Sequence, residues 1–406
     1  MTEKKTGFSA LARTAMATQE KLATVRSGAG AFIIGLPREI ALQEKRITLT
    51  PDAVALLVNN GHQVWVETHA GEGSNFTDHA YSEAGASIVL SPAEVYKAEI
   101  ILKVEPPTLA EIDLMRPGQT LISALQPGHL EPEYLHRLNA RRVTALAYEF
   151  IEDKGGGMPV IRAISEIAGI AALSVAAQYL STAESGRGII LGGITGVPST
   201  KMVIIGAGTV AENVARGALS LGAEVQIFDN HLYKLRRIKH ILGQQVYTST
   251  IDTIGLAETL RTADVVIGTL RAERGRSRHV VSEEMVRAMK PDSLIIDLSI
   301  DQGGCIATSA ITTHDDPVFR KYDVIHYCVP NIASRVARTA TTALSNFFTP
   351  TLLRAAEEGG IEEMIFNQRW FMKGVYTYRG HLTNEGIARR FALRHSAIEL
   401  LFASRF

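Results

Sequence analysis

One glycine-rich string constrains the fold of this chain more than any other feature of its sequence: Gly206-Ala207-Gly208-Thr209-Val210-Ala211. An apolar, strand-like segment over residues 202–205 leads into it, and a helical pattern over residues 210–219 follows it. This is the context that the G-x-G-x-x-A fingerprint of dinucleotide-binding domains requires. In that fingerprint the first glycine permits a tight turn, the second lets the backbone approach a pyrophosphate, and the alanine allows close helix–strand packing. An ordinary glycine turn of an α/β fold is the alternative, but the order of strand, turn and helix favours a dinucleotide site.

An acidic residue after the next predicted strand indicates which dinucleotide is bound. Asp229 follows the fingerprint at close to the roughly 20 residues expected of the acid that binds the adenosine ribose. Its carboxylate can accept hydrogen bonds from both ribose hydroxyls of NAD, and it would repel the 2′-phosphate of NADP. Arg236 and Arg237 are alternative partners for such a phosphate, but in a helical stretch they more often form a solvated face. The sequence therefore predicts NAD as cofactor.

The alternation of strand-like and helix-like segments predicts the domain organisation. The chain has 406 residues, enough for two or three domains. A Gly/Pro/Ser/Thr-rich break at residues 192–200 separates two α/β series, and the mostly helical part from about residue 339 is too short for a third domain. We therefore predict an α/β fold of two Rossmann-like doubly wound domains, the first discontinuous, with a cleft between them. The predicted units are an N-terminal arm at 1–30, a substrate (catalytic) domain at 31–160 plus 339–406, and an NAD-binding Rossmann domain at 161–338.

The composition of the chain limits the classes of binding partner and the cellular compartments that are expected. Lys+Arg and Asp+Glu are both 42, and this balance gives no support to a nucleic-acid or acidic-membrane partner. The most apolar stretch, Ile167 to Leu180, is shorter than the about 20 residues of a membrane span, and the N-terminus lacks the apolar core of a secretory signal. Two cysteines fit a reducing compartment. These features predict a cytoplasmic protein. No metal is expected, since His314, Asp315 and Asp316 are adjacent loop residues of a kind that more often caps and turns.

Several longer strings carry a resemblance to a known family: GLPREIALQEKRITLTPDAV, GHQVWVETHAGEGSNFTD, LGGITGVPSTKMVIIGAGTV, IDLSIDQGGCIATSAITTHDDPVF and HYCVPNIASRVARTATTAL. The chain resembles the alanine dehydrogenase family, which is related to the NAD-binding component of proton-translocating transhydrogenases. The resemblance runs from about Ile33 to Leu393, and the DQGG, TTHDDP and HYCV-N strings look like alanine dehydrogenase rather than the transhydrogenase component. It implies reversible NAD-dependent oxidative deamination of L-alanine to pyruvate and ammonia by a homo-oligomer, commonly a hexamer.

The same resemblance implies roles for individual residues. Arg46 matches the arginine that clamps the substrate carboxylate, for which a guanidinium fork is well suited. Asp301 matches the catalytic aspartate beside the nicotinamide, at the carboxyl end of a predicted strand where α/β sheets place ligands. Asn331 matches a loop residue that contacts cofactor and substrate. The remaining cofactor contacts that the resemblance implies are Ser165, Thr209, Val210, Lys234, Leu270, Ile300 and Val329. For Ser165, capping of the following helix is the alternative.

Two positions on the substrate side depart from the family pattern. Where the family has K-V-K-E-P, this chain has K-V-E-P-P starting at Lys103. An ungapped match places Glu105 at the substrate-binding lysine, and a one-residue gap would use Lys103 instead. Where the family has its catalytic histidine, this chain has Gln126, with His129 three residues later. A glutamine can hydrogen-bond a carbonyl but cannot exchange a proton near neutral pH, so Lys103, Gln126 and His129 all stand beside Asp301 as candidate catalytic residues.

These departures leave two alternative functions open. One is a related NAD-dependent reductase or dehydrogenase acting on another 2-oxo acid or amino acid, in which a basic amine of the substrate would pair with Glu105. The other is a non-catalytic NAD-binding module. The joint presence of Arg46 and Asp301 argues against a module, which would tolerate the loss of both.

Overall fold

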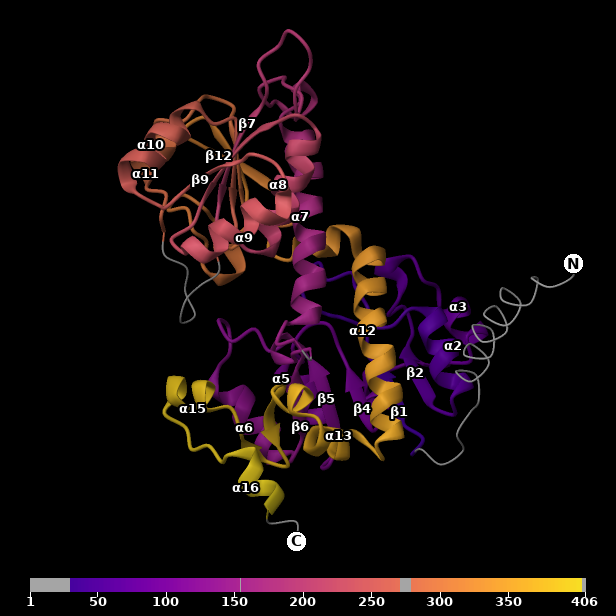
Figure 1. The fold of residues 1–406 in the computed structure, drawn as a ribbon. Helices are drawn as coiled ribbons and strands as arrows, with labels where there is room; N and C mark the ends of the chain where they lie inside the picture. Colours follow the sequence, from indigo (N-terminus) through magenta and orange to yellow (C-terminus); the bar gives the residue numbers. More distant parts are fainter. Residues whose placement is uncertain (1–29, 154, 271–278, 404–406) are drawn as a thin grey trace, which may run out of the picture.

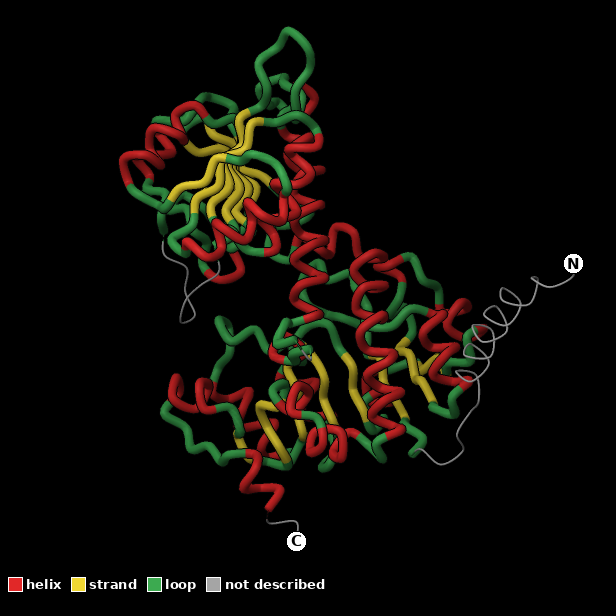
Figure 2. Tube along the Cα trace, in the orientation of Figure 1, coloured by secondary structure: helices red, strands yellow, loops and turns green. Residues whose placement is uncertain are grey.

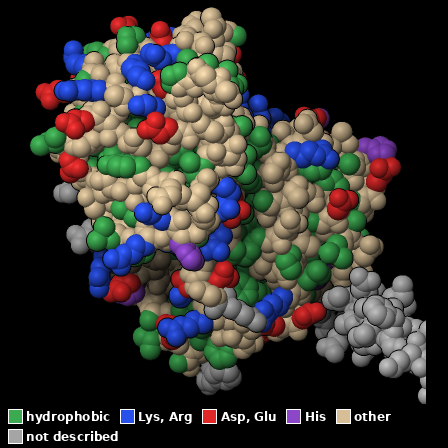
Figure 3. All heavy atoms as spheres, turned by 45° about the horizontal axis from the view of Figure 1, so that its top comes forward, with side chains coloured by type: hydrophobic (Ala, Val, Ile, Leu, Met, Phe, Trp, Pro, Cys, Tyr) green, Lys and Arg blue, Asp and Glu red, His purple; other side chains and the backbone are tan. Residues whose placement is uncertain are grey.

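The computed structural model describes residues 30–153, 155–270 and 279–403 of the chain. The predicted N-terminal arm lies outside the described residues except for Gly30. The described chain forms two lobes, each built on a mainly parallel sheet with helices on its faces (Figures 1 and 2). On the face drawn in Figure 3, acidic and basic side chains are interspersed, in keeping with the balanced composition.

The first sheet has the strand order β15-β14-β6-β5-β4-β1-β2-β3 in the described residues. Its strands are β1 (Ile33–Leu36), β2 (Gln63–Glu67), β3 (Ser87–Val89), β4 (Ile100–Leu102), β5 (Thr120–Ser123), β6 (Thr144–Ala147), β14 (Val375–Tyr378) and β15 (His381–Leu382). Its connecting helices are α2 (Pro51–Asn59), η1 (Glu72–Ser74), α3 (Asp78–Glu83), α4 (Pro92–Val95), α5 (Leu109–Leu114), α6 (Pro132–Ala140) and η2 (Tyr148–Phe150). From β3 to β6 the strands are parallel in the doubly wound order 3-2-1-4-5-6, so β1 and β4 flank the switch point where such sheets bind ligands.

The second sheet has the order β12-β13-β11-β10-β7-β8-β9 in the described residues, which is again doubly wound, with β7 and β10 at the switch point. Its strands are β7 (Lys201–Ile205), β8 (Glu224–Phe228), β9 (Tyr247–Ser249), β10 (Val265–Gly268), β11 (Leu294–Asp297), β12 (Val318–Lys321) and β13 (Val324–Tyr327). Its helices are α8 (Thr209–Ser220), α9 (Leu232–Leu242), α10 (Thr253–Thr262), α11 (Glu283–Arg287), η3 (Thr182–Glu184), η4 (Ile300–Gln302) and η5 (Ile332–Val336). The central strands are apolar and buried throughout, as expected of parallel strands covered on both faces.

Two long helices, α7 (Pro159–Tyr179) and α12 (Ala337–Glu357), connect the lobes and pack on each other (Figure 1). After α12 the chain continues through α13 (Ile361–Asn367), α14 (Arg369–Met372), β14, β15, α15 (Glu385–Phe391) and α16 (Ile398–Ala403). Because β14 pairs antiparallel with β6, the C-terminal part returns to the first sheet. The discontinuous α/β fold class predicted from the sequence is therefore confirmed, while the exact domain bounds stay a prediction.

One helix in the described part of the chain, α7, is long and apolar enough by composition to cross a membrane. Its residues Ala172, Val175 and Ala176 are buried in the core of the second lobe, and the helix packs on α8 and α12. Part of α7 therefore belongs to the core of the second lobe, and 33% of its most apolar stretch is buried.

Candidate active site

The glycine fingerprint forms the turn between β7 and α8, and Gly206 is required there for two reasons. Its φ is +113°, in a region that side chains disfavour, and a Cβ on it would lie 2.5 Å from the Thr269 Oγ1. Thr269 follows β10, and its backbone N–H donates to the Ile205 oxygen over 2.8 Å. The turn is thus held against the neighbouring strand at the switch point of the sheet.

Gly208 makes room for a ligand. A Cβ placed on it would have no heavy-atom neighbour within 4 Å, although the residue stands directly before the twelve-residue helix α8. The first N–H groups of a helix have no partner inside the helix, and they attract anions. Open space in front of this helix end fits the pyrophosphate of a dinucleotide.

Asp229 is held rigidly at the end of β8. Its carboxylate is almost fully buried and accepts hydrogen bonds from the N–H of Ala207 and the N–H of His231, both over 2.8 Å. The rival partners for a 2′-phosphate are placed differently: Arg237 forms a 3.0 Å ion pair with Glu212, and Arg236 is exposed on α9. The fixed Asp229 carboxylate would repel a 2′-phosphate, and Arg237 is already paired with Glu212. Both features favour NAD over NADP.

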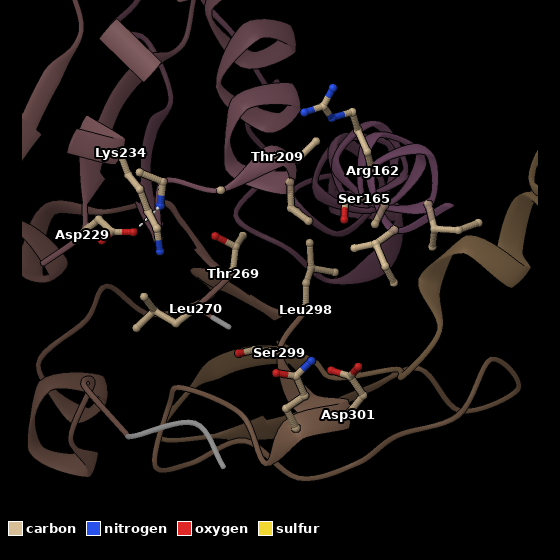
Figure 4. A pocket seen from close by; sticks show the side chains of 18 of the residues that line it. Arg162, Ser165, Thr209, Asp229, Lys234, Thr269, Leu270, Leu298, Ser299 and Asp301 are labelled. Atoms are coloured by element: carbon tan, nitrogen blue, oxygen red, sulfur yellow. Dashed lines mark hydrogen bonds between the residues drawn. The ribbon is translucent and has the colours of Figure 1, made fainter. Parts of the chain in front are cut away.

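A cavity of about 1230 Å³ extends from the fingerprint to the loop after β11. Most of the predicted cofactor contacts line it: Ser165, Gly206, Gly208, Thr209, Val210, Asp229, Lys234, Leu270, Asp301, Val329 and Asn331. Ala211 and Ile300 are buried and do not belong to the lining. Asp229 and Lys234 lie at one end of the cavity and Ser299 and Asp301 at the other (Figure 4). The elongated arrangement suits a dinucleotide whose adenosine ribose and nicotinamide occupy opposite ends.

Several lining residues were missed by sequence reasoning: Arg162, Ala168, Ala207, Asn230, His231, Thr269, Ser299 and Gln302. Thr269 and Ser299 follow the carboxyl ends of β10 and β11, so a survey of every predicted strand end would have found them. Arg162 and Ala168 reach the cavity from α7, and no local signal marks them.

A second cluster lies at the carboxyl edge of the first sheet, around Arg46. The Arg46 side chain is buried, and its Nε and Nη2 donate to the two carboxylate oxygens of Glu44 over 2.8 and 2.6 Å. Burial opposes ionisation of both groups, but their pairing outweighs it, so the pKa of Arg46 is raised and that of Glu44 is lowered. Asn331, which lines the dinucleotide cavity, donates from its amide nitrogen to Glu44. The arginine cluster and the cavity are therefore linked through one side chain.

The two departures from the family pattern lie side by side. The Gln126 amide nitrogen donates to Glu105 Oε2, and Glu105 Oε1 lies 3.4 Å from Arg46 Nη2. Gln126 has a left-handed backbone (φ +49°), and its N–H donates to Glu149 Oε1 over 2.9 Å. The structure thus joins Arg46, Glu105 and Gln126 into one cluster.

Lys103 belongs to a different, buried network. Its side chain is 1% exposed, and its ammonium lies 2.7 Å from Glu111 Oε1 and 3.4 Å from Glu39 Oε2. The Tyr96 hydroxyl donates to the same Glu111 oxygen over 3.0 Å. Burial favours neutral lysine, but the two carboxylates raise the pKa of Lys103, so it stays charged. A role for Lys103 at the substrate stays a prediction.

His129 and Asp301 meet across the two lobes, with the imidazole Nε2 2.8 Å from the Asp301 backbone oxygen. The Asp301 side chain is exposed to the cavity, and partial loss of hydration within the cavity walls raises its pKa. The N–H of Gln302 and the nearby His129 oppose that shift. In the TTHDDP loop, Asp315 accepts a 2.7 Å hydrogen bond from Gln43, and no group of three metal-ligating side chains occurs in the described ranges.

Comparisons with known proteins cover both lobes. Residues 35–168 match the model of the alanine dehydrogenase/PNT N-terminal domain, and residues 172–385 match that of the C-terminal domain. The alanine dehydrogenase of Bacillus subtilis is 41% identical over 361 residues, covering 88% of this chain and 94% of the relative. That of Methanococcus maripaludis is 39% identical over 372 residues, covering 91% and 99%.

Solved structures give the same picture. An L-alanine dehydrogenase superposes with a TM-score of 0.82 at 34% identity, covering 89% of this chain and 99% of that one. A transhydrogenase from Sinorhizobium meliloti has a TM-score of 0.74 at 24% identity over 87% of this chain, a likeness of fold alone. The resemblance stated from the sequence is confirmed, and the chain belongs to the alanine dehydrogenase/PNT family.

Proposed function

We propose that this protein catalyses the reversible, NAD-dependent oxidative deamination of L-alanine to pyruvate and ammonia. One observation carries the proposal: Asn331 lines the dinucleotide cavity and at the same time hydrogen-bonds Glu44, the partner of the buried Arg46. A group suited to binding a carboxylate is thus linked to a cavity suited to a dinucleotide, which supports the proposal. The names of the relatives support L-alanine as the substrate.

The described residues fit NAD as cofactor. The turn at Gly206 and Gly208 with the start of α8 would hold the pyrophosphate, and Asp229 would bind the adenosine ribose. Asp301 and Asn331 would flank the nicotinamide. When bound, this ring supplies the acceptor for the hydride of the substrate α-carbon.

Arg46 is prepared to hold the substrate carboxylate. Glu44 occupies its Nε and Nη2, and no hydrogen bond from its Nη1 to a described residue occurs. The remaining donor on a fixed guanidinium costs little conformational entropy to use. Gln126 and His129 would then hydrogen-bond the substrate oxygen or nitrogen, and Asp301 would position water and ammonia. Most of the rate would come from this orientation and from a charge-matched site.

An assay of NADH oxidation with pyruvate and ammonium tests the proposal, run beside a panel of other 2-oxo acids and amines. We expect pyruvate with ammonium to be the best pair, and Arg46→Gln to raise KM for pyruvate strongly. The control is Arg261→Gln, an exposed residue of α10. If another 2-oxo acid or an amine-bearing substrate is turned over far better, the alternative of a related reductase with Glu105 in its pocket takes precedence. If no pair is turned over while NADH binds, the chain is a binding module.

We also propose an assembly and a cellular location for the protein. Ile190, Ile194 and Val197 are exposed apolar residues of one loop beyond α7, and such groups commonly mark protein interfaces. Together with the family this supports a homo-oligomer, for which a hexamer is expected. The two free cysteines are buried thiols, in keeping with a cytoplasmic location.

A further inference from the structure

We infer that the Glu105 carboxyl, held between Gln126 and Arg46, exchanges the proton that the substrate oxygen gains and loses during the reaction. This inference rests on the proposed function and adds a catalytic residue to it. It starts from the observation that Glu105 accepts a hydrogen bond from the Gln126 amide with one oxygen and lies 3.4 Å from Arg46 Nη2 with the other.

The position of Glu105 suits a group that contacts the substrate. Its Oε2 accepts from the Gln126 amide, which orients the carboxyl, and its Oε1 lies 3.4 Å from Arg46 Nη2. Because Arg46 is the proposed carboxylate clamp, the α-carbon of a bound substrate and its oxygen or nitrogen would be a short distance from Glu105. The Glu105 side chain is 13% exposed, so it is largely shielded from bulk water.

The other charged groups near Arg46 already have charged partners. Glu44 is paired with Arg46 through both oxygens, and Lys103 is locked between Glu39 and Glu111. The Glu39 carboxylate accepts from the backbone N–H of Val104 and of Glu105.

A glutamine amide such as that of Gln126 does not exchange protons near neutral pH. His129 is bound to the Asp301 backbone, toward the nicotinamide end. Of the two described carboxyls that contact Arg46, Glu105 is the one that does not pair with it through both oxygens.

The surroundings of Glu105 shift the pKa of its carboxyl toward neutral pH. Burial raises the pKa of Glu105 to about 8; Arg46 opposes this shift, and the carboxylates of Glu44 and Glu39 add to it. Two further titratable groups lie near this cluster: the Tyr148 hydroxyl, which donates to the Val104 oxygen over 2.6 Å, and the Glu149 carboxyl, which accepts from the Gln126 N–H over 2.9 Å. A general acid–base group acts best when its pKa lies near the pH of operation.

The assigned step transfers a proton and no redox electrons. In the tetrahedral carbinolamine that water forms from the imine, a hydroxyl and an ammonium group share one carbon. The C–N bond breaks, and its electron pair leaves with nitrogen as ammonia. The O–H electron pair forms the second bond of the pyruvate carbonyl, and the proton passes to the Glu105 carboxylate. In the reverse direction, protonated Glu105 returns this proton to the oxygen as ammonia attacks.

The test is the pH dependence of kcat for L-alanine oxidation at saturating substrate and NAD, in wild type, Glu105→Gln and Glu105→Asp. We expect wild-type kcat to rise with pH through about 8, because the carboxylate form acts in this direction. In Glu105→Gln, kcat should fall about 10²-fold and this limb should vanish, with a much smaller change in KM. Glu105→Asp should keep a limb at shifted pH. The matched control is Glu258→Gln, an exposed carboxylate of α10.

The outcomes separate the two proposals. If wild type is active and Glu105→Gln keeps its rate or its pH limb, the role of Glu105 is overturned and the proposed function stands. A lowered rate with an unchanged limb would show a structural role and also overturns it. If wild type does not oxidise alanine, both proposals fail. NADH binding, followed by fluorescence, checks that each variant is folded. If Glu105→Gln does not bind NADH, the pH dependence of kcat in Glu105→Asp decides. The absence of a pH limb in that variant overturns the inference.

Discussion

His129 Nε2 lies 2.8 Å from the backbone oxygen of Asp301, so a residue of the loop after β5 contacts one that follows β11 in the other lobe. The contact connects the substrate side of the proposed site to its nicotinamide end. Because a carbonyl oxygen only accepts, the imidazole must carry its hydrogen on Nε2 to make this bond.

Removal of this contact should weaken catalysis moderately. A hydrogen bond of this kind contributes about 0.5–1.5 kcal/mol, so His129→Ala should lower kcat/KM for L-alanine by up to about tenfold. Steady-state kinetics measure it, with His79→Ala as the control, because His79 is an exposed residue of α3 paired with Glu83. A loss of several hundredfold would instead make His129 the main proton-exchanging group and weaken the case for Glu105.

Asp301→Asn tests the charge at the nicotinamide end, since it keeps the shape of the side chain. If the carboxylate positions water and ammonia and moves their protons, turnover should fall by about 10²-fold or more. NADH affinity, titrated by fluorescence, should change little. Near-normal turnover would mean that the match of the DQGG string reflects structure only.

Cofactor choice should depend on Asp229. A phosphate dianion beside this buried, fixed carboxylate should lower NADPH affinity at least about tenfold relative to NADH, which corresponds to about 1.4 kcal/mol. In Asp229→Ser the preference should narrow, while Arg236→Gln should leave it unchanged. Parallel fluorescence titrations with both cofactors decide the point, and equal affinity in the wild type would contradict the prediction.

Lys103→Met should reduce stability, whatever it does to activity. The substitution leaves Glu39 and Glu111 without their buried cation. The loss of one partner of a buried ion pair costs about 3–5 kcal/mol. Chemical denaturation measures the free energy of unfolding, with Lys97→Met as the exposed control, for which a change within about 0.5 kcal/mol is expected. An unchanged unfolding free energy in Lys103→Met would show that Lys103 has no structural role.

Much of the fold followed from local sequence. Strand, glycine turn, helix and acid occur in order along less than 30 consecutive residues, so the sequence alone predicts a dinucleotide site from Gly206 to Asp229. Alternating apolar segments determined the α/β class, and the short helical C-terminal part indicated a return to the first domain. These inferences depend on periodicity and on neighbours along the chain, which the sequence displays directly.

What only the tertiary structure decided is which distant side chains share a contact. Lys103 and Glu105 are two residues apart, yet the first is sealed between Glu39 and Glu111 and the second reaches Gln126 and Arg46. The sequence left both open as the substrate-side residue, because alternation along the chain does not tell which partners the opposing strands and loops supply. The doubly wound order brings the ends of β1, β4 and β5 to one edge, and that edge determines which charges meet. Pairing and burial at such an edge are properties of the assembled sheet, so no local pattern records them.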